Sequence, residues 1–138
     1  MLLNLFRKKP KDTRHAKGQY GENIAARFLK KEKQYKVLSR NWTHRHGEID
    51  IICEDKGCLV FVEVKARAAE SLQPGFYAVT SKKRATLRQA CKAYLNQLRL
   101  RPSSFRFDII EIRLPINEKE NPIIHHYINS PLFSKDYR

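Results

Sequence analysis

Residues 47–67 read GEIDIICEDKGCLVFVEVKAR. This stretch holds two segments rich in isoleucine and valine, Glu48 to about Glu54 and Cys58 to Lys65, which predict β-strands. The residues between them, 55–57, read DKG and are typical of a hairpin turn. We therefore expect the two strands to form a β-hairpin.

The first of these strands carries two acids. Because side chains alternate across a strand, we expect Glu48 and Asp50 on one face and Ile49 and Ile51 on the other. For Glu48 two interpretations stay open, a metal ligand or a hydrogen-bonding partner for the polar segment that precedes it.

The second strand carries Glu63 and Lys65, which are expected to share a face with Phe61, opposite the valines at positions 60, 62 and 64. Whether Asp50 and Glu63 meet depends on the register of the hairpin. They share a face if the numbers of cross-strand partners sum to an odd value, as two- or four-residue loops would give. A three-residue loop with a bulge would separate them.

Two neighbouring carboxylates in a partly buried sheet repel each other unless a cation or a proton offsets their charge. A hard divalent cation such as Mg²⁺ or Mn²⁺ takes carboxylate and carbonyl oxygens, so Asp50, Glu63 and the backbone carbonyl of Val64 form a candidate ligand set. Lys65 would orient or help deprotonate an attacking water, or offset charge on a phosphate. The alternative is a surface ion-pair ladder on a solvated sheet face.

Two helices and further strands are expected around the hairpin. Apolar periodicity predicts helices from Gly18 to about Glu32 and from about Ser81 to Leu100. Strands are expected at Tyr35–Arg40, Phe105–Leu114 and Ile123–Ile128, with polar or loop segments at Asn41–Gly47 and Ala66–Ser81. The order α-β-β-β-α-β(-β) predicts an α/β fold with a mixed central sheet flanked by helices. We divide the chain into a flexible basic arm at 1–17, a domain at 18–114, and a strand and tail at 115–138.

The first helix brings Glu22 within reach of the same site. The alternative for Glu22 is an acid in the first helical turn, where the helix dipole favours negative charge. On the second helix, Arg84, Arg88 and Lys92 follow one stripe at i, i+4 and i+8. This stripe is either a solvated face or a surface that follows phosphates.

The chain has 28 lysines and arginines against 14 acids and a net charge of +14, which indicates a polyanionic partner. No apolar run approaches the roughly 18 residues that span a bilayer, so we expect nucleic acid as the partner, no membrane, and a cytoplasmic location. Cys53, Cys58 and Cys91 are interpreted as small buried residues, and a zinc site is not expected.

Three segments together carry a resemblance: GEID at 47–50, VFVEVKAR at 60–67 and RFD at 106–108. From about Gly18 to Arg113 the chain resembles the YraN family, which is similar to archaeal Holliday-junction resolvases and restriction endonucleases of the PD-(D/E)-x-K type. The resemblance implies a restriction endonuclease-like fold, Mg²⁺-dependent cleavage of DNA, branched or damaged DNA included, and a homodimer. Ile49 precedes Asp50 where the wider superfamily often has proline.

Carried onto this sequence, the resemblance assigns the catalytic roles to four residues: Glu22, Asp50, Glu63 and Lys65. The expected nucleic-acid contacts are Arg45, Arg67, Lys83, Arg84, Arg88 and Lys92, of which Lys83 falls where the family has a lysine at the start of the second helix. Trp42 and Tyr77 are candidates for base stacking or for packing.

Two other function classes remain open on the sequence. A non-catalytic nucleic-acid-binding module on the same fold would need the basic residues but not a converging set of acids, because acids repel phosphate unless a metal intervenes. A basic adaptor on protein or membrane would leave the acids dispersed.

Overall fold

The computed structural model describes residues 14–45, 47–68, 79–117 and 119–134. The helices are α2 (Arg14–Lys31) and α3 (Ser81–Gln97), and the strands are β1 (Lys36–His44), β2 (Gly47–Asp55), β3 (Cys58–Ala68), β4 (Phe105–Leu114) and β5 (Ile123–Tyr127). This order confirms the expected α-β-β-β-α-β-β arrangement, including the fifth strand.

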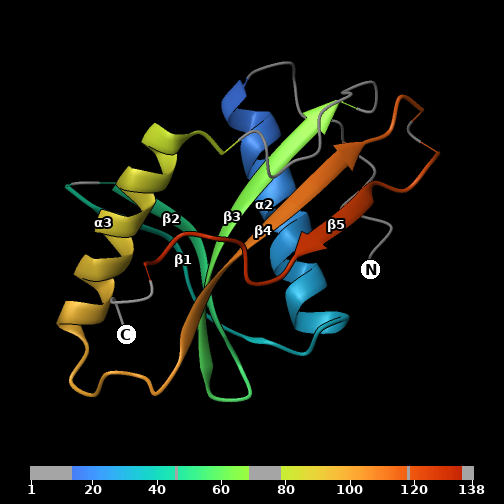
Figure 1. The fold of residues 1–138 in the computed structure, drawn as a ribbon. Coiled ribbons are helices and arrows are strands. Elements are labelled where there is room, and N and C mark those ends of the chain that lie inside the picture. The colour runs from blue at the N-terminus through green and yellow to red at the C-terminus, as the bar shows by residue number, and fades with distance from the viewer. Residues whose placement is uncertain (1–13, 46, 69–78, 118, 135–138) are drawn as a thin grey trace.

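The five strands form one mixed sheet in the order β1-β2-β3-β4-β5. β3 and β4 run parallel, and the other neighbours are antiparallel. A parallel pair requires a crossover connection, and α3 lies within it. Figure 1 shows α2 behind β3 and β4, and α3 on the other side, beside β1 and β2. The sheet therefore separates the two helices.

The hairpin of β2 and β3 has the odd register, one of the two that the sequence left open, with Asp55 opposite Cys58 and Ile51 opposite Val62. Its two-residue loop consists of Lys56 and Gly57, which both have positive φ angles, 47° and 86°. Such turns match the right-handed twist of the strands that they join. The loop fixes the register, and the register brings Asp50 and Glu63 to corresponding positions on the two strands.

Each face of the sheet buries its own hydrophobic core. The α3 side includes Ile49, Ile52, Phe61, Leu87, Tyr94 and Phe107. The α2 side includes Ile24, Leu29, Ile51, Val60, Val62 and Ile110. Phe61 and the valines of β3 thus face opposite sides, as expected, and by alternation Glu63 lies on the α3 side.

The alternation expected for residues 48–51 is wrong. Ile49 belongs to the α3-side core and Ile51 to the α2-side core, so these two side chains do not share a face. The cause lies in β1, where Asn41 follows the pair Arg40–Ile51 and has a left-handed φ of 51°. In both strands, side chains two residues apart therefore point to opposite sides of the sheet here: Ile49 and Ile51 in β2, and Arg40 and Trp42 in β1.

Several element boundaries differ from the expected ones. α2 begins at Arg14, and β1 continues to His44, through residues expected in a polar connection. The strand extends because residues 42–44 pair with residues 47–49 of β2, and backbone groups left unpaired there would be costly. Residues 1–13 and 69–78, which include Tyr77, lie outside the described residues.

The described cysteines form no disulfide. Cys53 and Cys91 are buried on opposite sides of the sheet, Cys58 is partly exposed, and all three are free thiols. Neither described helix combines the length and the apolar character that crossing a membrane would need.

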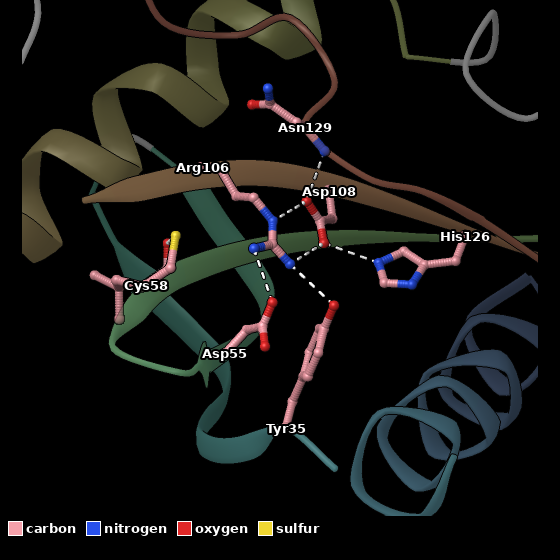
Figure 2. A network of polar contacts seen from close by, with 8 residues as sticks. Tyr35, Asp55, Cys58, Arg106, Asp108, His126 and Asn129 are labelled. Carbon is pink, nitrogen blue, oxygen red and sulfur yellow. Dashed lines mark hydrogen bonds and ion pairs between the residues drawn. The ribbon is translucent and has the colours of Figure 1, made fainter. Parts of the chain in front are cut away.

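A buried polar network ties four parts of the chain together at the end of the sheet far from the β3 and β4 C-termini (Figure 2). Arg106 donates to Asp108 at 2.9 Å, to Asp55 at 3.1 Å and to the Tyr35 hydroxyl at 3.0 Å. Asp108, fully buried, also accepts from the Asn129 N–H at 2.9 Å and pairs with His126 at 2.8 Å. The RFD segment that contributed to the family resemblance is therefore structural.

Burial alone would raise the pKa of Asp108, but hydrogen bonds from His126, Arg106 and the Asn129 N–H outweigh it and lower the pKa. A carboxylate with this many donors is stable in the charged form. The network thus joins β4 to the hairpin and to the segment after β5 without an unsatisfied charge on Asp108.

Two glycines allow close approach of the helices to the sheet. A Cβ on Gly21 of α2 would lie 2.7 Å from the Cβ of Ala66, and one on Gly47 would lie 2.7 Å from Cγ2 of Thr86. Neither neighbour is the far end of a flexible side chain. The first contact holds α2 against β3 one residue before Glu22.

We expect Gly21→Ala to lower the free energy of unfolding by about 1–3 kcal/mol, because the added methyl overpacks the contact with Ala66. Gly18 is the matched control, since it lies in the same helix with nothing within 4 Å of an added Cβ. There Gly18→Ala should raise stability by about 0.5–1 kcal/mol. Urea unfolding of both variants measures this, and equal effects of the same sign would contradict the packing of α2 on β3.

Candidate metal centre

Asp50 lies where the pairing of β2 and β3 ends. The ladder runs from the turn to Ile51 and Val62. Beyond it, the backbone N–H of Val64 donates to the Asp50 carboxylate at 2.8 Å. The side chain of Asp50 thus replaces a backbone acceptor, and this bond holds the carboxylate between the two strands.

Two further acids converge on Asp50. One carboxylate oxygen from each of Glu22, Glu48 and Asp50 lies within 4.8 Å of the others. Glu22 is in the interior of α2, which begins eight residues before it at Arg14, so its interpretation as a first-turn acid is wrong. Glu48, paired with Thr43 of β1, is exposed. The expected reach of Glu22 to Asp50 is confirmed.

Glu63 borders Asp50 from the α3 side of the sheet. Its side chain is only 3% exposed, and its Oε1 lies 3.7 Å from Nζ of both Lys65 and Lys83. Its Oε2 is buried and has no hydrogen-bond partner within the described residues. Thr80 caps α3 by accepting a hydrogen bond from the Lys83 N–H at 3.2 Å, and so fixes the turn that carries Lys83.

Neighbouring acids raise the pKa values of Glu22 and Glu63. Burial, followed by the Asp50 carboxylate and Glu48, raises the pKa of Glu22 to about 7, although Arg40 opposes the shift. Burial and then Asp50 raise the pKa of Glu63 to about 8, against the opposing effect of Lys83 and Lys65. Asp50 is the shared neighbour of both groups. Without a cation, Glu22 and Glu63 therefore bind a proton more tightly than an ordinary glutamate does.

This donor set fits a hard divalent cation. Carboxylate oxygens are the ligands that Mg²⁺ and Mn²⁺ prefer, and Asp50 with Glu22 and Glu48 offers three of them within a few ångströms. The buried Oε2 of Glu63 also favours a cation here, because a buried carboxylate oxygen without a partner is costly and a bound cation would offset that cost. Glu63 lies beside Asp50 but is not part of the triplet of mutually close oxygens, so the ligand pair Asp50 and Glu63 stays a prediction.

The expected nucleic-acid contacts occupy different surroundings. Arg84 and Arg88 donate to the backbone carbonyls of Pro131 and Leu132. With Lys92 and residues 131–134 they line a hollow of about 490 Å³. Figure 1 shows this C-terminal segment crossing from β5 to α3. The stripe on α3 therefore binds the backbone of Pro131 and Leu132 and also borders a hollow whose described lining includes no acid.

The remaining basic candidates lie elsewhere on the surface. Arg67 lies 3.6 Å from the fully buried Glu111, which also pairs with Arg113 at 2.9 Å. Arg45 is exposed at the turn between β1 and β2. Trp42 packs edge-on against Tyr94 at 5.3 Å and stacks with His44, so packing is its observed role.

Sequence patterns did not single out Asn41, although it lies among the acids. Its amide, with the NH₂ directed to the acids, donates to Glu22 Oε2 at 2.7 Å and to Glu48 Oε1 at 3.2 Å. The interpretation of Glu48 as a partner of residues 41–46 is confirmed by this contact, and its proximity to Asp50 keeps the ligand interpretation open. An asparagine before an apolar strand residue gives no periodic signal by which this role could have been found.

The fold and the cluster define a mixed α/β protein with four acids and two lysines around the end of its central hairpin. The family model described as "Uncharacterised protein family UPF0102" matches residues 21–112. The chain belongs to this family, which is the YraN family of the sequence resemblance.

Known proteins similar to this chain carry the same family name. A UPF0102 protein of Nitratidesulfovibrio vulgaris (strain DP4) is 42% identical over 99 residues, 72% of this chain and 73% of that protein. A UPF0102 protein of Syntrophomonas wolfei is 36% identical over 113 residues, 82% of this chain and 95% of that protein. Among solved structures, a repair endonuclease from Pyrococcus abyssi aligns with a TM-score of 0.42 at 13% identity. That alignment covers 81% of this chain but only 43% of the endonuclease.

We expect the stability of the metal-free protein to fall as pH rises from about 4.5 to about 8. The pKa values of Glu22 and Glu63 are raised in the folded state from 4.5 to about 7 and about 8, so the folded protein binds these protons more tightly than the unfolded chain does. Their contribution is present below pH 4.5 and is lost as pH rises through 7 and 8. Urea unfolding in chelator across this range measures the loss.

Glu63→Gln should show a smaller loss, because the amide stays neutral at every pH. The exposed Glu32 provides the control, and Glu32→Gln should follow the wild-type curve. Addition of Mg²⁺ at pH 8 should restore stability to the wild type, since a ligand that binds only the folded state stabilises it. Identical pH profiles for wild type and Glu63→Gln would contradict the assignment.

Proposed function

We propose that this protein is a divalent-metal-dependent endonuclease that cleaves phosphodiester bonds in DNA. The observation that carries the proposal is the convergence of Glu22, Glu48, Asp50 and Glu63 at one end of the hairpin, with two lysines 3.7 Å from Glu63. The chain has a net charge of +14, and four of its 14 acidic residues meet here. Such a cluster repels a phosphate unless a cation lies between them.

The proposed ligands of the cation are Asp50 and Glu63, with Glu22 contributing directly or through water. A bound Mg²⁺ or Mn²⁺ would polarise a phosphoryl oxygen and offset the charge that develops on it. The Lys65 side chain is 31% exposed, and its Nζ lies 3.7 Å from Oε1 of Glu63. Its proposed role is to orient or help deprotonate an attacking water. Lys83, 40% exposed on the first turn of α3, supplies a second positive charge for the phosphate.

Binding to the nucleic acid is assigned to basic residues of α3, of β3 and of the turn between β1 and β2. Its proposed contacts are Arg45, Arg67, Lys83, Arg84, Arg88 and Lys92. Lys83 on α3 lies 3.7 Å from Glu63. The next residue, Arg84, is the first of the three α3 cations that line the hollow. A substrate strand leaving the cluster along α3 would meet these cations. The alternative function, a non-catalytic DNA-binding module, would use the same surface without the acids.

We expect Asp50→Asn, Glu63→Gln and Lys65→Ala each to abolish cleavage while leaving the fold intact, because each removes a proposed ligand or the group beside the water. Binding in metal-free buffer should survive, and Asp50→Asn should bind at least as tightly, since an acid that repels phosphate is gone. The measurement is cleavage of linear, flapped and four-way DNA with Mg²⁺, Mn²⁺ or chelator.

Glu54→Gln on β2 is the matched control for this series and should cleave as the wild type does. If the wild type cleaves no substrate with either metal, or if the three variants cleave equally well, the binding-module function replaces the nuclease.

DNA binding should be chiefly electrostatic, with the logarithm of affinity falling linearly with the logarithm of salt by about 0.9 per phosphate contact on duplex DNA. Arg45→Gln and Lys92→Gln should each reduce that slope by about 0.9 if each residue contacts one phosphate. Lys33, which lies over the Phe28 ring on the α2 side, is the charge-matched control. Fluorescence titrations across a salt series test this, and equal slopes for all three variants would exclude α3 and the β1–β2 turn as the binding surface.

A further inference from the structure

Asn41 of β1 adopts a backbone conformation that is uncommon for a residue with a side chain. Its φ of 51° lies in the left-handed region, which asparagine tolerates better than most residues. On one side of it Arg40 donates to Asn23 of α2 at 2.6 Å, and on the other Trp42 packs into the α3-side core. The strand therefore changes the side that it presents at Asn41.

This conformation places the Asn41 amide between two acids. The NH₂ group donates to Glu22 at 2.7 Å and to Glu48 at 3.2 Å, and it carries two hydrogens, one for each acid. The opposite orientation of the amide would set its oxygen against carboxylate oxygens. Glu22 comes from α2 and Glu48 from β2, so a residue of a third element holds the two together.

The third acid of the group is held in the same way. Asp50 accepts a hydrogen bond from the backbone N–H of Val64 on β3 at 2.8 Å. Each carboxylate has about four lone-pair sites, so one hydrogen bond leaves several free. Donors on β1 and β3 therefore restrain all three acids within 4.8 Å of one another, against their mutual repulsion, while their remaining lone pairs stay available.

The neighbouring Glu63 provides an independent sign that a cation belongs here. Only 3% of Glu63 is exposed, and its Oε2 has no hydrogen-bond partner among the described residues. Because Asp50 adjoins Glu63 and also belongs to the group with Glu22 and Glu48, one cation near Asp50 would relieve the whole set.

We propose that Glu48 is a further carboxylate ligand of the divalent cation and that Asn41 is the positioning residue that holds Glu48 and Glu22 for it. The proposal rests on the proposed function in that it takes the cluster as a metal site. Asn41 needs no contact with the cation or with the nucleic acid. Loss of its amide lets Glu22 and Glu48 move apart, so the cation is bound more weakly at an unchanged fold.

The test is calorimetric titration of the full-length protein with Mn²⁺ in the absence of nucleic acid. Asn41→Gly deletes the amide but suits the left-handed backbone, whereas Asn41→Ala deletes the amide and strains the backbone. Both should bind Mn²⁺ about tenfold or more weakly, as loss of a group that orients a metal ligand typically does. Glu48→Gln should weaken binding at least as much. Urea unfolding should show Asn41→Ala alone to be destabilised by backbone strain.

Asn129 supplies a matched control, because it is also an exposed asparagine with a positive φ, 56°, outside the cluster. Its backbone N–H, which donates to Asp108, is retained in Asn129→Gly. That variant should bind Mn²⁺ as the wild type does.

Three results would overturn the proposal: wild-type affinity in Asn41→Gly, weaker binding in Asn41→Ala alone, or wild-type affinity in Glu48→Gln. Cleavage of DNA is a separate readout. A wild type that binds Mn²⁺ but cleaves nothing removes the nuclease function and leaves this proposal standing. A wild type that cleaves DNA while Asn41→Gly binds Mn²⁺ normally removes only this proposal.

Discussion

The hydrogen bond from the Val64 N–H to the Asp50 carboxylate is the interaction on which the site depends. A β-hairpin normally satisfies its amides by pairing with backbone carbonyls, but here the ladder of β2 and β3 ends at Ile51 and Val62. A side chain completes the pairing. The acid is thereby fixed between the strands, where acids from the α2 side and from the α3 side both reach it.

Two buried acids of the same sheet lie in opposite electrostatic environments. Asp108 is surrounded by donors from Arg106, His126 and Asn129, which lower its pKa although burial opposes them. Glu63 is equally enclosed, but burial and Asp50 raise its pKa to about 8, and one of its oxygens has no partner among the described residues. The first environment stabilises a charge with the protein's own groups. The second leaves a charge that an external cation or a proton must offset.

Much of this arrangement could be predicted from the sequence. The apolar periods located each of the described helices and strands, and the DKG segment located the hairpin turn. The two-residue loop, which sets the odd register and brings Asp50 and Glu63 together, was one of the loop lengths that the sequence left open. The family resemblance selected Glu22, which lies eight residues into α2 and carries no local signal of its own. Lys83 was placed by the same resemblance, and its Nζ lies 3.7 Å from Glu63.

The rest depended on tertiary structure. Strict alternation misplaced Ile49 and Ile51 because one left-handed residue on the neighbouring strand changes the side that both strands present. The role of Asn41 could not be predicted either, because its two partners, Glu22 and Glu48, come from a helix and from another strand. The carbonyls that Arg84 and Arg88 bind belong to a segment more than 40 residues away, which a helical stripe cannot reveal.

We propose that Asp50 anchors a divalent cation among these acids. Anomalous diffraction from crystals of the protein soaked in Mn²⁺ tests it most directly. We predict one strong peak about 2.1 Å from an Asp50 oxygen, with further oxygens from Glu22, Glu48 or Glu63 in the coordination sphere. Crystals that show no anomalous peak at Asp50 at saturating Mn²⁺, or a peak only at other acids, would contradict it.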